Sequence, residues 1–161
     1  VARLWGLLRL GERDEFAIQV ARRRLLERQR EDGGWSQTEQ LASDAYSTAT
    51  TLWVLQQAGL ERDAAARRRA AVWLLKNQQP DGSWLVVTRA TPVQAYFDNG
   101  DPHGKSQFLS LAATGWAVIE AARDIKRQLE ARAAQLWSVD VAAVSTRLMR
   151  WRSCWCRDRP G

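Results

Sequence analysis

Apolar residues recur every three or four positions along two segments of the chain, and this spacing predicts helices with one apolar face. The two stripes are Phe16, Val20, Leu25 and Leu26 in the first segment and Ala70, Trp73, Leu74 and Asn77 in the second. The one candidate for a strand is the short run 85–88. The pattern therefore predicts an all-α protein.

Asp-Gly pairs mark the ends of both predicted helices, at 32–33 and 81–82. Glycine accepts the positive φ that is common at a helix end, so each pair is expected to break its helix. Ser43 or Asp44 can cap a further helix over 45–58, which stops at the next glycine. The sequence thus indicates helices joined by short turns.

The segments around the two Asp-Gly pairs are copies of one another. Residues 25–35 and 74–84 both read Leu-Leu, then Gln, then Asp-Gly-x-Trp, at an offset of 49 residues. A second pair of segments, 46–53 and 109–116, shares Ser, Ala, Thr and Trp at an offset of 63. The repeating unit is therefore a helix, an Asp-Gly-x-Trp turn and a second helix.

The repeats divide the chain into three predicted parts. They are 1–14, a remnant of a preceding helix; 15–122, a domain of helical-hairpin repeats; and 123–161, a basic tail. The two hairpins span about 15–58 and 62–122, and the second carries an additional loop at 85–105.

The repeated motif Gln-x-x-x-Gly-x-Trp resembles the QW motif of squalene and oxidosqualene cyclases, which belong to the prenyltransferase and squalene oxidase repeat family. Its two copies are Gln29, Gly33, Trp35 and Gln78, Gly82, Trp84. The resemblance implies an arc of an α/α toroid. It also implies that the Gln amide bonds the free N–H groups at the start of a neighbouring helix, with Trp shielding the contact. These six residues are then structural.

Cyclases of this family protonate their substrate with an Asp-x-Asp-Asp-Thr-Ala motif. The segment 44–49 stands in the matching place and keeps the first Asp, the Thr and the Ala. Tyr46 and Ser47 replace the two later aspartates, and neither is acidic enough to protonate an alkene. We interpret Asp44 as a helix cap, with a residual catalytic role as the alternative. Whether the chain is an enzyme stays open.

The related protein prenyltransferases hold zinc with Asp, Cys and His. This chain has one histidine, His103, and its two cysteines, Cys154 and Cys156, lie in the tail outside the repeats. We therefore expect no metal site and no cofactor.

The loop at 85–105 gathers polar residues, and long ordered loops are often functional. The candidate ligand-binding residues are Arg89, Tyr96, Asp98, His103 and Lys105. Asp101 and His103 are further candidates for acid or base chemistry. The alternative is that Asp, Asn, Pro and Gly only shape turns here.

The net charge of +6 does not indicate a nucleic-acid-binding face, because residues 1–122 carry 15 of the 24 basic and 14 of the 18 acidic side chains. The excess lies in the tail, for which a shifted reading frame and contact with nucleic acid or a membrane surface are competing interpretations. No apolar run approaches the roughly 20 residues of a transmembrane helix.

Two functions agree with these observations. The first is a fragment of a squalene-cyclase-like protein, not a competent cyclase itself, that binds an apolar, isoprenoid-like ligand or a protein partner such as the rest of the toroid. The alternative is part of a terpene cyclase whose acid motif lies outside this chain. The resemblance suggests a bacterial protein, and its compartment, cytoplasmic or periplasmic and membrane-peripheral, stays open.

Overall fold

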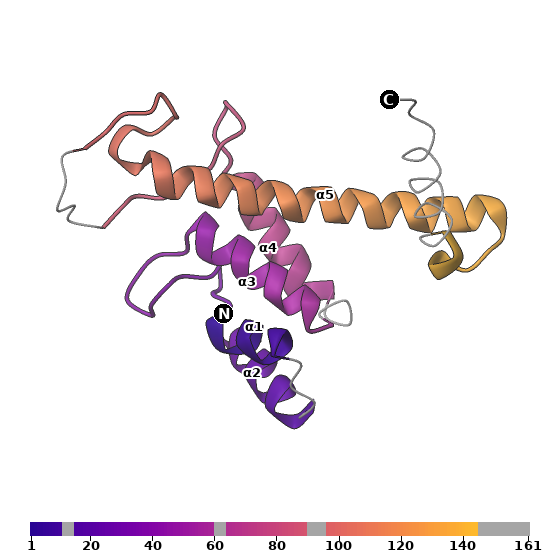
Figure 1. Cartoon of the computed structure of the whole chain (residues 1–161). Coiled ribbons are helices and arrows are strands. Elements are labelled where there is room, and N and C mark those ends of the chain that lie inside the picture. The colour runs from indigo at the N-terminus through magenta and orange to yellow at the C-terminus, as the bar shows by residue number, and fades with distance from the viewer. Residues whose placement is uncertain (11–14, 60–63, 90–95, 145–161) are drawn as a thin grey trace, which may run out of the picture. The chain divides into compact units, whose positions relative to one another are not determined.

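The computed structural model describes residues 1–10, 15–59, 64–89 and 96–144, and it forms two compact units, Val1–Glu120 and Ala121–Gly161. Within the described residues every regular element is helical and no strand occurs (Figure 1). The elements are α1 (Ala2–Arg9), α2 (Glu15–Glu27), α3 (Ala45–Gln57), α4 (Ala64–Lys76), the 3₁₀-helix η2 (Gly104–Ser106) and α5 (Gln107–Trp137). The predicted all-α class is confirmed, whereas the arc of a toroid stays a prediction.

Helix α3 is the most buried element of the first unit. Nine of its 13 residues are buried, and it packs against α1, α2 and α4. It begins at Asp44, whose carboxylate accepts a hydrogen bond from the Ser47 backbone N–H at 2.7 Å, so Asp44 rather than Ser43 is the cap. The chain leaves the helix at Gly59, where φ is +80°. The predicted helix is therefore confirmed at both ends.

The predicted face of α4 is confirmed for Ala70, Trp73 and Leu74, which are all buried, whereas Asn77 is exposed and follows the end of the helix. The prediction for Phe16 is wrong, because its side chain is 76% exposed. The buried face of α2 runs through Ala21 and Leu25, and at about 100° per residue Phe16 lies far around the helix from them.

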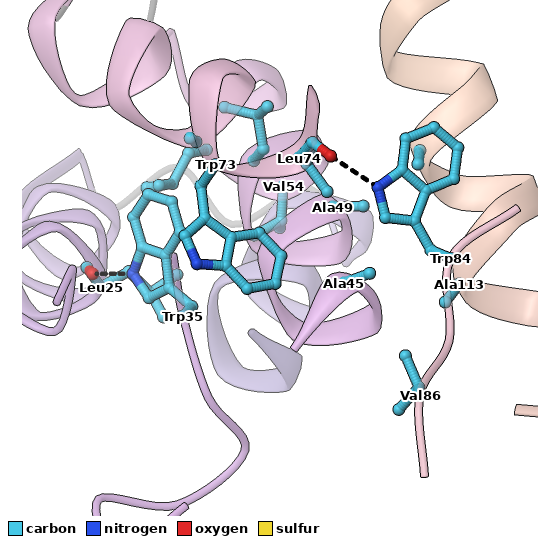
Figure 2. Close-up of a cluster of buried hydrophobic side chains, with 14 of the residues drawn as sticks. Leu25, Trp35, Ala45, Ala49, Val54, Trp73, Leu74, Trp84, Val86 and Ala113 are labelled. Atoms are coloured by element: carbon cyan, nitrogen blue, oxygen red, sulfur yellow. Dashed lines mark hydrogen bonds between the residues drawn. The ribbon is translucent and has the colours of Figure 1, made fainter. Parts of the chain in front are cut away.

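Three tryptophans occupy the core of the first unit. Trp35, Trp73 and Trp84 are 2%, 9% and 5% exposed (Figure 2). Around them lie small and aliphatic side chains, among them Leu25, Ala45, Ala49, Val54, Leu74, Val86 and Ala113. Each Asp-Gly-x-Trp turn thus contributes one large ring to the core, and α4 contributes the third through Trp73.

The second unit contains the end of α5 and a short helical turn. Ser138 has φ of +50°, and the Val139 N–H bonds the Ala134 carbonyl at 3.1 Å, which closes the helix. Asp140 then accepts a bond from the Ala142 N–H at 2.7 Å and starts the next turn. The described part of the predicted tail is therefore mostly helical, and Cys154 and Cys156 lie outside the described residues.

Candidate functional site

The two Asp-Gly-x-Trp turns share one conformation. In each turn the Gln amide donates to the carbonyl of the Gly four residues later, Gln29 to Gly33 and Gln78 to Gly82, both at 2.9 Å. The two glycines have φ of +92° and +84°, a region that side chains with a Cβ rarely adopt. The glycine of the motif is therefore required by the backbone in both copies.

Both motif tryptophans point back at the helix that precedes them. The indole N–H of Trp35 donates to the Leu25 carbonyl, and that of Trp84 donates to the Leu74 carbonyl, each at 2.8 Å (Figure 2). Both carbonyls lie in the last turn of a helix, where each also accepts a backbone N–H from the residue three positions later, at 3.3 Å and 3.1 Å respectively. Each indole therefore helps to satisfy a helix end while it fills the core.

Helix α4 packs on the first Asp-Gly-x-Trp turn. Gln29 donates to the Ala66 carbonyl at 2.8 Å, and its own carbonyl accepts a hydrogen bond from the Arg69 guanidinium. The indole N–H of Trp73 donates to the Asp32 carboxylate at 3.0 Å. Gln29 therefore joins the two hairpins, but these bonds reach a carbonyl and a guanidinium rather than the expected free N–H groups.

The packing of α4 on this turn depends on two consecutive glycines. A Cβ on Gly33 would lie 2.7 Å from the Arg69 carbonyl oxygen. A Cβ on Gly34 would lie 2.7 Å from the Ser43 side chain and 3.0 Å from the Trp73 ring. Helix α4 can therefore approach the turn this closely only because both positions lack a side chain.

The second turn is open on the same side. The Gln78 amide is exposed, and among the described residues its hydrogen-bond partner is Gly82 alone. Apart from its two chain neighbours, the nearest atom of the described residues to where a Gly82 Cβ would stand is the Gln78 amide nitrogen, at 3.9 Å. Within the described residues, Gln78 and Gly82 therefore lack the helix contact that Gln29 and Gly33 make, whereas Ser83 is contacted by His103.

A chain of three polar residues borders the second turn. Ser83 donates its hydroxyl proton to Asp81 at 2.6 Å and lies 2.7 Å from Nε2 of His103. Because a hydroxyl has one proton, Nε2 of His103 must be the donor in that second bond. Hydrogen bonds from the Ser83 hydroxyl and N–H, and then the charge of His103, hold the pKa of Asp81 below its usual 3.8. These residues line a cleft of about 230 Å³ beside the first turns of α5.

The run 85–88 belongs to an extended strap that lies along α5 rather than to a sheet. Alternate backbone N–H groups of the strap donate to hydroxyls spaced by four residues; the pairs are Trp84 with Thr114, Val86 with Ser110 and Thr88 with Ser106. Two residues of an extended chain and one turn of a helix cover similar lengths, about 6.7 and 5.4 Å, so the registers match. In the first hairpin the Trp35 N–H likewise donates to Thr48.

Asp44 is engaged as a helix cap. One carboxylate oxygen accepts from the Ser47 N–H at 2.7 Å, and the other accepts from the Ser47 hydroxyl at 2.8 Å. Ser47 is itself buried, and Tyr46 is half-buried. The segment that resembles the acid motif therefore starts α3 with a carboxylate whose two oxygens both act as acceptors.

Asp98 and Asp101 shape the loop backbone. Asp98 accepts from the Gly100 N–H at 2.9 Å, and Asp101 accepts from the Asn99 amide at 2.8 Å. Desolvation and the nearby Asp98 carboxylate raise the pKa of Tyr96. The structure thus brings Tyr96 and Asp98 together as a local pair within the turn.

The other loop candidates point to different partners. Arg89 bonds the Gln37 side chain of the first hairpin, His103 meets Ser83, and Lys105 is exposed. The predicted ligand loop is therefore not gathered into one site. The part of the loop at 90–95 lies outside the described residues. Nowhere in the described ranges do three metal-binding side chains cluster.

Three further tryptophans form a ladder across α1, α3 and α5. The Trp5 and Trp53 ring centroids lie 6.3 Å apart at 64°, and those of Trp53 and Trp116 lie 5.3 Å apart at 60°. Trp5 is 47% exposed. We did not predict this ladder, although its signal is present: Leu-Trp-x-Leu occurs at 4–7 and again at 52–55.

Part of the sequence matches a known protein family. Residues 18–97 match the family model of the squalene-hopene cyclase N-terminal domain. Over these residues the chain is similar to that domain. The match includes both copies of the turn, and it therefore confirms the family resemblance that the motifs indicated.

A relative of this cyclase-like domain is labda-7,13-dienyl diphosphate synthase from Streptomyces clavuligerus, with 40% identity over 79 residues. The aligned part is 49% of this chain and 14% of the relative, so the chain spans a small fraction of the relative's length. No solved structure matches the chain. No helix in the described part of this chain is long and apolar enough to cross a membrane.

Proposed function

We propose that this squalene-hopene cyclase-like domain is part of an α/α toroid and binds an apolar, isoprenoid-like chain without supplying the acid for cyclisation. The observation that carries the proposal is Asp44, the one aspartate left from the acid motif, which serves as the cap of α3. The expected activity of the isolated chain is therefore binding rather than turnover.

Asp44 is poorly placed to act as an acid. Both of its oxygens accept hydrogen bonds, and it lies at a helix N-terminus. Both oxygens are therefore engaged with Ser47 in capping α3, whereas a proton donor needs an oxygen directed at the substrate. Tyr46 and Ser47, which stand where the family has its other aspartates, cannot replace it.

The tryptophan ladder offers a surface for an apolar ligand. Trp5 and Trp53 meet edge to face, Trp53 and Trp116 are tilted against each other, and Trp5 exposes about half of its surface. Aromatic faces contribute a large apolar contact area that suits an unsaturated hydrocarbon chain. The relative's name describes a dienyl diphosphate product, which favours an isoprenoid as the ligand class.

Tryptophan fluorescence of the full chain, titrated with geranylgeraniol, tests this proposal. We expect saturable quenching, and Trp5→Ala should weaken binding about two- to tenfold, the range that one aromatic contact contributes. Phe16→Ala, which removes a ring that is 76% exposed and outside the ladder, is the matched control. Turnover of squalene or geranylgeranyl diphosphate by the chain alone would contradict the proposal, as would equal effects of the two substitutions.

The second candidate is a terpene cyclase whose acid belongs to a segment beyond this sequence. The relative supports it, because it is a synthase of which the aligned part is only 14%. Sequencing the genomic DNA on both sides of the coding segment decides between them. Further Gln-x-x-x-Gly-x-Trp repeats and an Asp-x-Asp-Asp motif in the same frame would establish the cyclase.

A further inference from the structure

A polar pair lies next to two rings of the tryptophan ladder. The Gln56 side-chain amide of α3 donates a hydrogen bond to the Glu120 carboxylate of α5. Gln56 follows Trp53 by three residues and Glu120 follows Trp116 by four, so each polar residue shares a helix face with one ring. The ring contact and the hydrogen bond therefore join α3 to α5 at successive helical turns.

Glu120 is the more deeply buried member of the pair. It is 4% exposed, whereas Gln56 is half-buried. A carboxylate is costly to remove from water unless hydrogen-bond donors compensate it. The Gln56 amide is one such donor, and because it belongs to α3, the compensation depends on where α3 lies against α5. Burial of Glu120 therefore favours one spacing of the two helices at this turn.

The hydrogen bond constrains that spacing more tightly than the ring contact does. Aromatic pairs are stable over centroid separations of about 4.5–7 Å. Trp53 and Trp116, at 5.3 Å and 60°, lie inside that range, so their contact alone does not fix their separation. A hydrogen bond between a side-chain N and O keeps its two atoms within a range of about 0.5 Å. The bond between Gln56 and Glu120 is therefore able to hold the two rings at one separation.

We propose that Gln56 and Glu120 are positioning residues of the tryptophan ladder. Their hydrogen bond sets the spacing of Trp53 and Trp116, and this spacing determines how tightly the ladder binds an isoprenoid-like chain. The ligand half of the inference rests on the proposed function, whereas the effect of the polar pair on the rings needs no ligand. Both polar side chains act through the rings rather than by touching the ligand.

Exchanging the donor and the acceptor in the full chain tests the proposal. Gln56→Glu removes the donor and brings a second carboxyl group against Glu120. Gln56→Glu combined with Glu120→Gln restores a donor and an acceptor, with the amide now on α5. Glu120→Gln alone keeps an acceptor for the Gln56 amide. Gln57→Glu, which adds the same charge at the exposed neighbouring position of α3, is the matched control.

Exciton coupling in the circular dichroism of the indoles, measured without ligand, reports the ring spacing. Because the chain has nine tryptophans, the signal of this pair is taken as the difference between each variant and the same variant carrying Trp116→Phe. We expect Gln56→Glu to lose most of this signal and to weaken geranylgeraniol binding about two- to tenfold, the range that one hydrogen bond contributes. The double variant, Glu120→Gln and Gln57→Glu should keep both. Trp35→Phe, whose ring lies outside the ladder, should lose stability and keep the signal, which separates ring spacing from stability.

Two results would overturn the positioning role: an unchanged pair signal in Gln56→Glu, or a folded double variant that does not regain the signal. Loss of the signal with unchanged geranylgeraniol binding would overturn the link between ring spacing and the ligand. Failure of the wild type to bind geranylgeraniol would contradict the proposed function and with it the ligand half of the inference. The pair signal would then still decide whether Gln56 and Glu120 set the spacing of the rings.

Discussion

Trp35 and Leu25 are joined by a 2.8 Å hydrogen bond from the indole N–H to the backbone carbonyl, and Trp84 and Leu74 repeat this contact 49 residues later. We predict that Trp35→Phe lowers the free energy of unfolding by about 1–3 kcal/mol, since it keeps a ring but leaves a buried acceptor with fewer donors. Trp84→Phe should cost a similar amount. Urea denaturation followed by circular dichroism measures both, and a loss in only one variant would show that the two turns are not equivalent.

Substitutions at the two motif glycines distinguish the energetic cost of backbone strain from that of close packing. Gly82→Ala introduces a Cβ at positive φ into open space, and we expect a loss of about 1–2 kcal/mol. Gly33→Ala adds a contact of 2.7 Å with the Arg69 carbonyl oxygen, so its loss should be larger by about 1–3 kcal/mol. Denaturation midpoints of the two variants give the difference. Equal losses would mean that α4 does not press on the first turn.

Gln29 and Gln78 form a second matched pair. Gln29→Ala removes the bonds to Ala66 and Arg69 on the next hairpin, in addition to the bond to Gly33 within the turn, and should cost about 2 kcal/mol. Gln78→Ala removes one bond within its own turn and should cost about 0.5–1 kcal/mol. Thermal unfolding of both variants tests the ranking, and the reverse order would rule out Gln29 as the link between hairpins.

The sequence predicted local structure better than contacts between elements. Helix α3, its cap at Asp44 and the glycines of the two turns follow from capping and backbone preferences, which act within a few residues. The predicted partners of Gln29, the free N–H groups at a helix start, are wrong, because Gln29 bonds the Ala66 carbonyl and the Arg69 guanidinium. Which groups Gln29 reaches depends on how α4 is rotated about its axis. That rotation is set by packing on Gly33 and Gly34, which no local pattern encodes.

The loop at 85–105 and the tryptophan ladder likewise depend on contacts between elements that are far apart in the sequence. Asp101 and His103 are both candidates for acid or base chemistry in the sequence, yet the bond of His103 goes to Ser83, which is 20 residues away in the sequence. The ladder was missed because the repeat around Trp5 contains no Asp-Gly turn to draw attention to it. The shared Leu-Trp-x-Leu at 4–7 and 52–55, which lies outside the turns, is the pattern that makes Trp5 and Trp53 equivalent positions.

Substitutions at Asp44 distinguish a cap from an acid. Asp44→Ala should lower the free energy of unfolding by about 1 kcal/mol, because the Ser47 N–H loses its acceptor. Asp44→Asn keeps an acceptor at the helix start and should stay within a few tenths of a kcal/mol of the wild type. Chemical denaturation measures both. If Asp44→Asn were as unstable as Asp44→Ala, the charge rather than the cap would account for the contribution of Asp44.

Asp81 gives the second turn a defined response to acid. Its pKa is lowered by hydrogen bonds from Ser83 and by the charge of His103, so it lies below 3.8, the value we take for the unfolded chain. A carboxyl with a depressed folded pKa contributes stability above its unfolded pKa and loses it as the pH falls through the folded value. The contribution of Asp81 should therefore be complete above about pH 4 and disappear below the folded pKa.

Carboxyl-carbon NMR titration should show the pKa of Asp81 rising towards 3.8 in Ser83→Ala. Ser36→Ala, whose hydroxyl bonds the Thr38 carbonyl instead, should leave the Asp81 titration unchanged. If Ser83→Ala also left it unchanged, the Ser83 hydroxyl would not be the group that fixes Asp81.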